Sequence, residues 1–278
     1  VGDDKQVSPT AAFIPIRQLE QHRANFLRDK FFGSLMLPGN SLYDLAGAVF
    51  PASKLMLREH FRCVEPIIRF SMQFYSAPDG DDPLYPVRLP KPSERLDPPL
   101  IAIHVPHGEK SRSQTNRAEA EVIVAEIEQL VQDPAMAGRS IGVVSLIGGK
   151  QAELIQSMML ERLGDAPFER HQIACGDSAT FQGKERDIMF VSMVECARTA
   201  TSKTATMFQQ RFNVALSRAR DRMVLVYSVD EKRLKPDDLK AKVLRHYRDP
   251  MPRSRPGGGD PLALCQSGFE RSVLRYLL

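Results

Sequence analysis

The chain lacks any long apolar run, and this absence argues against a membrane-spanning helix. None of its hydrophobic stretches approaches the roughly 20 residues that a helix needs to cross a bilayer. No signal-peptide pattern opens the sequence either. Its 42% of hydrophobic and 26% of charged residues are ordinary for a soluble globular protein. We therefore expect a cytoplasmic protein without a membrane partner.

Cysteine pairs at metal-binding spacing are also missing. The four cysteines are Cys63, Cys175, Cys196 and Cys265, far apart and with no CxxC pair. This spacing suggests neither a zinc site nor a disulfide framework, and buried thiols are expected instead. His104 and His107 form an HxxH pattern without a third ligand, which is typical of a strand end that runs into a loop. The sequence therefore predicts no metal site in this chain.

The net charge of +4 leans toward a polyanionic partner without requiring one. Most of the excess lies between residues 232 and 255, where nine lysines and arginines face three aspartates. A solvated helix face followed by a linker explains such a run, and contact with phosphates is the alternative.

A loop between two apolar runs is the most informative part of the sequence. The runs at 171–175 and 187–194 predict strands, and the polar stretch at 176–185 predicts the loop between them. Another buried strand is expected at 223–229. A strand–helix–strand crossover favours a parallel sheet whose loops carry the functional site.

A helix is predicted before this last strand. Apolar residues recur at the helical spacing i, i+3, i+4 and i+7, namely Phe212, Ala215, Leu216 and Ala219. Arg211, Arg218 and Arg220 fall on the same predicted helix and cannot all point into the core. Arg218 lies closest to the buried stripe, where an unpaired charge is costly, so we expect it to have an anionic partner. A salt bridge on the helix surface is the simpler interpretation.

Further patterns complete an α/β prediction. Strands are expected at 100–105 and 141–147, and helices at 17–30, 116–133 and 150–163. Pro66 is expected to open another helix as its first residue, and Gly164 to end the helix at 150–163. Asn116 as N-cap with Glu119 three residues later matches a capping box.

A phosphate-binding loop is not predicted at Gly148-Gly149-Lys150. The Walker A pattern needs a glycine five residues before the Gly-Lys pair and Ser or Thr after it. Here Val144 holds the first glycine position and Gln151 follows the lysine.

Four segments in chain order resemble motifs III to VI of superfamily 1 helicases. They are GDDKQVSP at 2–9, HFR at 60–62, DSATFQGKE at 177–185 and RFNVALSRAR at 211–220. The last is similar to the form that motif VI takes in the Upf-like branch. A single short match would be weak evidence for the family. The four segments occur in the family's order, and together they cover roughly residues 1–229.

The resemblance implies an ATP site. Gln6, Arg62 and Arg218 match residues that reach the γ-phosphate of ATP in the family. Phe61 matches an aromatic residue, usually tyrosine, that stacks on adenine, and Val7 replaces a leucine of motif III. Without the resemblance, Phe61 would be assigned to the core and Arg62 to a surface ion pair.

Motif V and a segment before it imply further contacts. Gly183 matches a glycine that permits close backbone approach, and Glu185 matches the glutamate that binds the nucleotide ribose. Thr180 matches a residue that contacts a phosphate of the bound strand. Ser145 replaces a threonine whose hydroxyl has the same role, although the residues after it depart from the family pattern. A turn glycine and a solvated loop are the alternatives for motif V.

The fold implied by the resemblance is a RecA-like α/β domain, the second motor domain of an ATP-dependent helicase. The implied cofactor is ATP with Mg²⁺, whose metal ligands are expected in a first RecA-like domain. Single-stranded nucleic acid is the implied partner, with DNA favoured over RNA. This chain alone is therefore expected to bind ATP weakly and to hydrolyse none.

The expected domain organisation has five parts. Residues 1–12 end the first RecA-like domain, 13–54 connect, 55–248 form the second RecA-like domain, 249–267 are a linker, and 268–278 begin a C-terminal domain. The start of the last part resembles the opening of Vsr-like endonuclease domains, and a plain terminal helix is the alternative.

Two other functional classes stay open at this point. One is a non-catalytic nucleic-acid-binding module that kept the fold and lost the motor. The other is the motor part of a nuclease or restriction-type defence protein.

Overall fold

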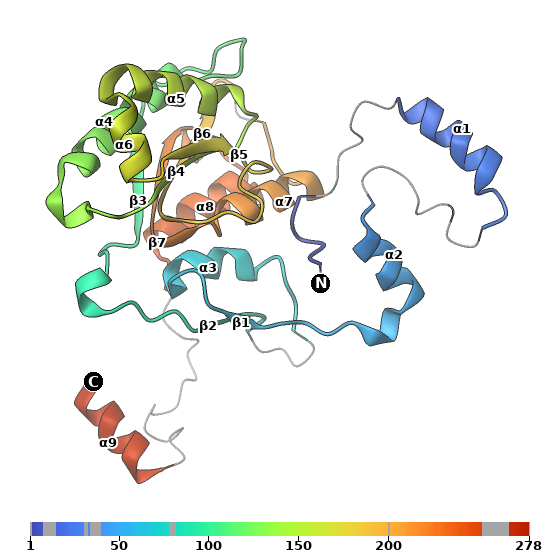
Figure 1. Cartoon of the computed structure of the whole chain (residues 1–278), viewed down its shortest axis with the longest axis horizontal. Coiled ribbons are helices and arrows are strands. Elements are labelled where there is room, and N and C mark those ends of the chain that lie inside the picture. The colour runs from blue at the N-terminus through green and yellow to red at the C-terminus, as the bar shows by residue number, and fades with distance from the viewer. Residues whose placement is uncertain are drawn as a thin grey trace.

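The chain folds around a five-stranded parallel sheet (Figure 1). The computed structural model describes residues 2–7, 15–30, 33, 40–77, 82–199, 201–251 and 267–277. In sheet order the strands are β3 (Leu100–His104), β7 (Ala219–Ser228), β6 (Arg186–Cys196), β4 (Ile141–Ser145) and β5 (Ala174–Asp177). Every neighbouring pair is parallel, so the predicted α/β class is confirmed.

Helices cover both faces of the sheet. The strands therefore alternate their buried side chains between two cores. In β6, Ile188 and Phe190 belong to one core, whereas Met189 and Val191 belong to the other. This period of two follows from the pleat of a strand. The first core includes α4 (Arg117–Gln132) and α5 (Lys150–Leu163), and the second includes α3 (Glu65–Met72), α7 (Thr206–Ala215) and α8 (Leu239–Arg248).

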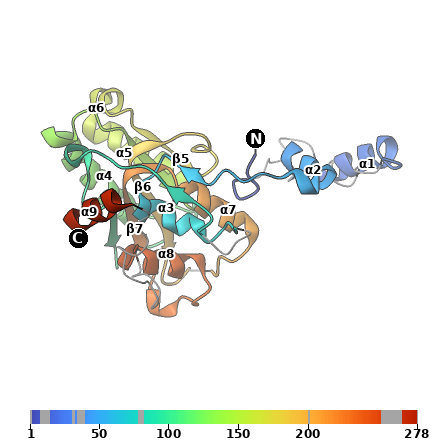
Figure 2. The same cartoon turned by 90° about the horizontal axis from the view of Figure 1, so that it is seen from below.

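The remaining elements lie around this layered unit. They are α1 (Ile16–Phe26), α2 (Leu42–Val49), α6 (Asp165–Arg170), α9 (Gly268–Leu277), a parallel pair of β1 (Glu59–His60) with β2 (Tyr85–Pro86), and 3₁₀ turns at Pro51–Ser53, Pro92–Glu94, Pro134–Met136 and Glu231–Arg233. Figures 1 and 2 show α1 and α2 extending away from the sheet. Among the described helices, none is long and apolar enough to cross a membrane.

The thiols and histidines singled out by the sequence have structural surroundings. Cys63 and Cys196 are buried and Cys175 is half-buried, all as free thiols, whereas Cys265 lies outside the described residues. His104 is the last residue of β3, as predicted. Within the described ranges, no group of three or more His, Cys, Asp or Glu side chains is arranged to hold a metal ion.

The basic run of residues 232–255 is only partly a solvated face, and its residues 252–255 lie outside the described ranges. Lys240 is 1% exposed, and its Nζ lies 2.9 Å from a carboxylate oxygen of Glu195 and 3.2 Å from one of Asp238. This lysine therefore fixes α8 against the end of β6 and is not available to a polyanion.

The helix predicted at 150–163 is confirmed as α5 with the same ends. Gly164 follows it with φ of +69°, a conformation that costs a residue without Cβ little. Pro66 is the second residue of α3, after Glu65, rather than the first. Proline is tolerated there because the first N–H groups of a helix have no intrahelical acceptor.

The helix predicted across Ala219 is too long. Helix α7 ends at Ala215, Leu216 caps it, and Ala219 is already the first residue of β7. The apolar spacing misleads because Ala219 is buried as a strand residue, and burial alone does not distinguish the two conformations. As a result, Arg218 lies in the turn between α7 and β7, and Arg220 lies on the strand.

The predicted capping box at the start of α4 is half right. The Asn116 side chain accepts a hydrogen bond from the Glu119 N–H at 3.2 Å, as an N-cap does. The Glu119 carboxylate, however, turns away from the N-cap backbone toward the ends of β6 and β7. It accepts hydrogen bonds from Ser192 Oγ (2.7 Å), the Val194 N–H (2.8 Å) and Ser228 Oγ (2.8 Å). Tertiary partners outcompete the local one here.

Glu119 is fully buried, and burial raises its pKa to about 7 although its hydrogen bonds lower it. The folded protein thus binds a proton more tightly than the unfolded chain, so this contribution to stability is present at acidic pH and is lost as pH rises toward 7. We expect the free energy of unfolding of the wild type to fall between pH 5 and pH 8 relative to Glu119→Gln, by up to roughly 3 kcal/mol. Denaturant unfolding at several pH values measures this, and parallel pH profiles would contradict it.

Candidate functional site

Arg218 is a buried arginine whose hydrogen bonds go to neutral oxygen atoms. Only 2% of its surface is exposed. Its Nε donates to the carbonyl oxygen of Val214 at 3.0 Å, and its Nη2 donates to Oε1 of Gln6 at 3.5 Å. Within the described part of the chain, no carboxylate oxygen lies within 4.0 Å of its guanidinium. Burial lowers the pKa of Arg218 to about 10, and the nearby Arg62 adds to the lowering.

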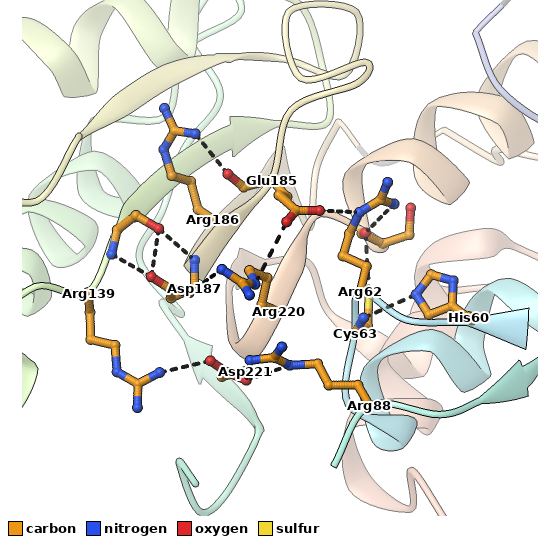
Figure 3. Close-up of polar contacts among 12 residues, drawn as sticks. His60, Arg62, Cys63, Arg88, Arg139, Glu185, Arg186, Asp187, Arg220 and Asp221 are labelled. Atoms are coloured by element: carbon orange, nitrogen blue, oxygen red, sulfur yellow. Dashed lines mark hydrogen bonds and ion pairs between the residues drawn. The ribbon is translucent and has the colours of Figure 1, made fainter. Parts of the chain in front are cut away.

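Arg62 lies near Arg218, at the end of the sheet where β6 and β7 begin, in the connection from β1 to α3. The Val64 N–H donates to the carbonyl oxygen of Arg220 at 2.9 Å, and Arg62 Nη1 donates to that of Ser217 at 3.4 Å. Arg62 Nε also donates to Glu185 at 2.7 Å, and the other Glu185 oxygen lies 3.7 Å from Arg220 Nε. Figure 3 shows Glu185 between the two arginines.

Acidic partners are present for three other arginines at this end of the sheet. Asp221, 1% exposed, accepts from Arg88 at 2.7 Å and from Arg139 at 2.8 Å (Figure 3). Asp187 lies 3.4 Å from Arg220 Nη1. These pairs neutralise three arginines, whereas no carboxylate of the described residues lies in salt-bridge contact with Arg218, and Asp3 raises its pKa only from beyond 4.0 Å. Arg186, whose guanidinium also donates to carbonyl oxygens, is more exposed, so its burial distinguishes Arg218.

His60 and Phe61 form the turn that presents Arg62. His60 Nε2 lies 3.1 Å from the Cys63 N–H and accepts its hydrogen bond, so the ring is neutral (Figure 3). Burial first, then Arg62 and Arg218, lower the pKa of His60 to about 4. Phe61 is 72% exposed, which rules out its assignment to the core. Its ring is free to stack on a planar ligand beside Arg62.

Comparison with known proteins gives this fold and site a family. A family model described as an AAA domain matches residues 39–230, which is most of the chain. The chain belongs to this AAA-domain family. The domain is helicase-like, with the parallel sheet flanked by helices that a RecA-like fold requires.

Similarity to individual proteins adds little to the family assignment. A solved structure described as the C-terminal domain of a possible DNA helicase from Lactobacillus plantarum WCFS1 is 13% identical to this AAA domain, with a TM-score of 0.36. The match covers 61% of this chain and 87% of that chain. No curated protein matches the chain.

The predicted nucleic-acid residues of the AAA domain lie apart from the site around Arg218 and Arg62, here called the arginine site. Thr180 is exposed three residues after β5, where its N–H and Oγ1 both donate to an oxygen of Asp177 at 2.9 Å. Ser145 ends β4, is 1% exposed, and pairs its Oγ with the backbone of Ile147. The structure does bring together Arg218, Arg62, Gln6 and Glu185 at the end of the sheet where β6 and β7 begin, and the exposed Phe61 precedes Arg62 in the chain. Their individual roles stay predictions.

Three residues of the site were missed by sequence reasoning. Asn213, Tyr75 and Asp3 connect Gln6 to α7 and α3 through hydrogen bonds. Asn213 offered one signal, because it is a polar residue inside the apolar run FNVAL that precedes Arg218. Tyr75 offered none, since an aromatic residue after an apolar helix is normally part of a core.

Glycine is required at position 183, two residues before Glu185, because the backbone there has a φ of +79°. An added Cβ would meet nothing within 4 Å, so the cost of Gly183→Ala is conformational. We expect this change to lower the free energy of unfolding by about 1–2 kcal/mol. Gly47→Ala in the exposed helix α2, also without a contact, is the control and should raise it by up to about 1 kcal/mol. Equal effects in denaturant titrations would refute the backbone argument.

Proposed function

We propose that this AAA domain is the second motor domain of an ATP-dependent superfamily 1 helicase of the Upf-like branch. In this proposal it presents Arg218 and Arg62 to the γ-phosphate of ATP. A first RecA-like domain holds the nucleotide with Mg²⁺, and the two domains move along single-stranded nucleic acid, DNA in preference to RNA.

The buried charge of Arg218 is the observation that carries the proposal. An ion taken out of water without a counter-ion costs several kcal/mol, so proteins retain one mainly where a ligand completes it. Its present partners, the carbonyl of Val214 and the amide of Gln6, are neutral. A phosphate oxygen would supply the missing charge, and the second guanidinium of Arg62 suits a polyphosphate better than a single carboxylate.

Preorganisation is the chemical advantage of this arrangement. Phosphoryl transfer, which bound ATP and Mg²⁺ would supply, spreads negative charge over the oxygens of the transferred group. A guanidinium fixed in advance stabilises that charge without having to reorganise, and this is worth about 10³- to 10⁵-fold in rate. Arg218 is fixed by α7 through Val214, and the Arg62 backbone turn is held by His60 and Cys63.

Neighbouring groups suit the rest of a nucleotide. The exposed ring of Phe61 offers a face to adenine next to Arg62. The Glu185 side chain, 44% exposed, can accept hydrogen bonds from ribose hydroxyls, provided that it exchanges its bond with Arg62. The turn at Gly183 leaves room for backbone approach.

Single-stranded nucleic acid is assigned to the opposite ends of the strands. Thr180 follows the end of β5 with an exposed side chain that could donate to a backbone phosphate in place of Asp177. Ser145, at the end of β4, would need the loop after it to open first, because it is buried and bonded to Ile147.

Binding of inorganic tripolyphosphate to this chain tests the arginine site directly. We expect Arg218→Ala to weaken binding by at least about tenfold, since it removes charge-assisted hydrogen bonds. Arg233→Ala is the matched control, because it removes the same charge from an exposed side chain paired with Asp230. Isothermal titration calorimetry measures both. An affinity of Arg218→Ala equal to that of the wild type would overturn the proposal.

In a protein that contains both motor domains, Arg218→Ala should lower the kcat of nucleic-acid-stimulated ATP hydrolysis by about 10³-fold or more. The affinity for single-stranded DNA should stay unchanged, because Arg218 lies at the opposite end of the sheet from Thr180. Arg218→Lys keeps the charge without the planar fork and should be intermediate. Retention of most turnover by Arg218→Ala would show that Arg218 does not act on the γ-phosphate.

A further inference from the structure

Residues 2–7 are held against the AAA domain through their backbone. Gln210 Nε2 donates to the carbonyl oxygen of Asp4 at 3.1 Å, and Asn213 Nδ2 donates to that of Lys5 at 2.9 Å. Gln182 Nε2 donates to the carbonyl oxygen of Val7 at 3.4 Å. Three carboxamide side chains, two from α7 and one from the loop before β6, thus reach carbonyl groups of one short segment.

A tyrosine completes this arrangement. The Tyr75 hydroxyl, just beyond α3, donates to an oxygen of Asp3 at 2.8 Å. It accepts from Asn213 Nδ2 at 2.9 Å. Asn213 is 3% exposed, and with Lys5 and Tyr75 as acceptors both hydrogens of its amide nitrogen are used. Burial raises the pKa of Tyr75, so the hydroxyl keeps the proton that it donates.

These bonds decide which way Gln6 points. Gln6 Nε2 donates to Asp3 at 2.9 Å, to the same oxygen that accepts from Tyr75. An ionised carboxylate only accepts hydrogen bonds, so the amide nitrogen must face Asp3. The amide oxygen of Gln6 then faces Arg218 Nη2, at 3.5 Å. Reversing the amide would place an N–H against the guanidinium, where two donors meet.

We propose that Tyr75 and Asn213 are positioning residues of the arginine site. They hold Asp3 and the backbone of Lys5, Asp3 orients Gln6, and Gln6 orients the guanidinium of Arg218. The inference rests on the proposed function and deepens it, because it makes docking of residues 2–7 a condition for full affinity at the arginine site. The affinity for a phosphate ligand therefore depends on whether residues 2–7 are docked.

A double-mutant cycle in the complete chain tests the order of action. We expect Gln6→Ala and Tyr75→Phe each to weaken tripolyphosphate binding by about three- to tenfold, the effect of one misplaced hydrogen bond. The double variant should be no weaker than the weaker single variant, since Tyr75 acts through Gln6. Tyr227→Phe, whose ring stacks on His104, is the matched control and should bind as the wild type does.

Trypsin cleavage after Lys5 gives a second readout that needs no ligand. The Lys5–Gln6 bond should be cut several-fold faster in Tyr75→Phe than in the wild type or in Tyr227→Phe, because an undocked backbone is accessible. Should Tyr75→Phe fail to fold, Asn213→Asp replaces it, as this isosteric change removes the donor to Lys5.

The outcomes separate this inference from the proposed function. Additive effects of Gln6→Ala and Tyr75→Phe, or no effect of Tyr75→Phe, would overturn the positioning role while loss of binding in Arg218→Ala still supported the arginine site. Unchanged binding in Arg218→Ala would overturn the proposed function and the inference with it. Non-additive losses together with faster cleavage would support both.

Discussion

The site is organised by the burial of one positive charge. Arg218 lies in a turn with 2% of its surface exposed, and it is held by a carbonyl and an amide oxygen instead of a carboxylate. Such a group is stable only if its surroundings are fixed, because any relaxation would bring it into water or to a counter-ion. The connection from α7 to β7 and the docked segment 2–7 supply that fixed frame.

The parallel sheet explains how distant segments reach this frame. Strands β6 and β7 begin at the same end of the sheet, so the Arg186 N–H donates to the carbonyl oxygen of Arg218 at 3.0 Å, although a strand and a helix separate the two residues in sequence. The connection from β1 to α3 is attached to the start of β7 through Val64 and Arg220, and it carries Arg62. Aspartates at this end of the sheet pair with Arg88, Arg139 and Arg220, whereas the buried Arg218 has no carboxylate of the described residues in salt-bridge contact.

The opposite end of the sheet, where β6 and β7 end, is held together by buried hydrogen bonds. There Glu119 joins α4 to the ends of β6 and β7 with several hydrogen bonds, and burial raises its pKa to about 7. Gln151 extends this buried network to α5 through both backbone groups of Asn116. The end of the sheet at which we propose that nucleic acid binds is therefore held by buried hydrogen bonds beneath its loops, whereas the end with the arginines is completed by residues 2–7.

The sequence by itself determined the α/β alternation, the ends of α5, and the expectation that Arg218 needs an anion, because these follow from local periodicity, capping and the cost of a buried charge. Only the tertiary structure decided that α7 stops before Ala219 and that Glu119 turns away from its own cap. It alone also brought Tyr75, Asp3 and Asn213 together. Local pattern records which residues are buried, whereas hydrogen bonds between distant segments depend on the register of strands and helices that no local pattern contains.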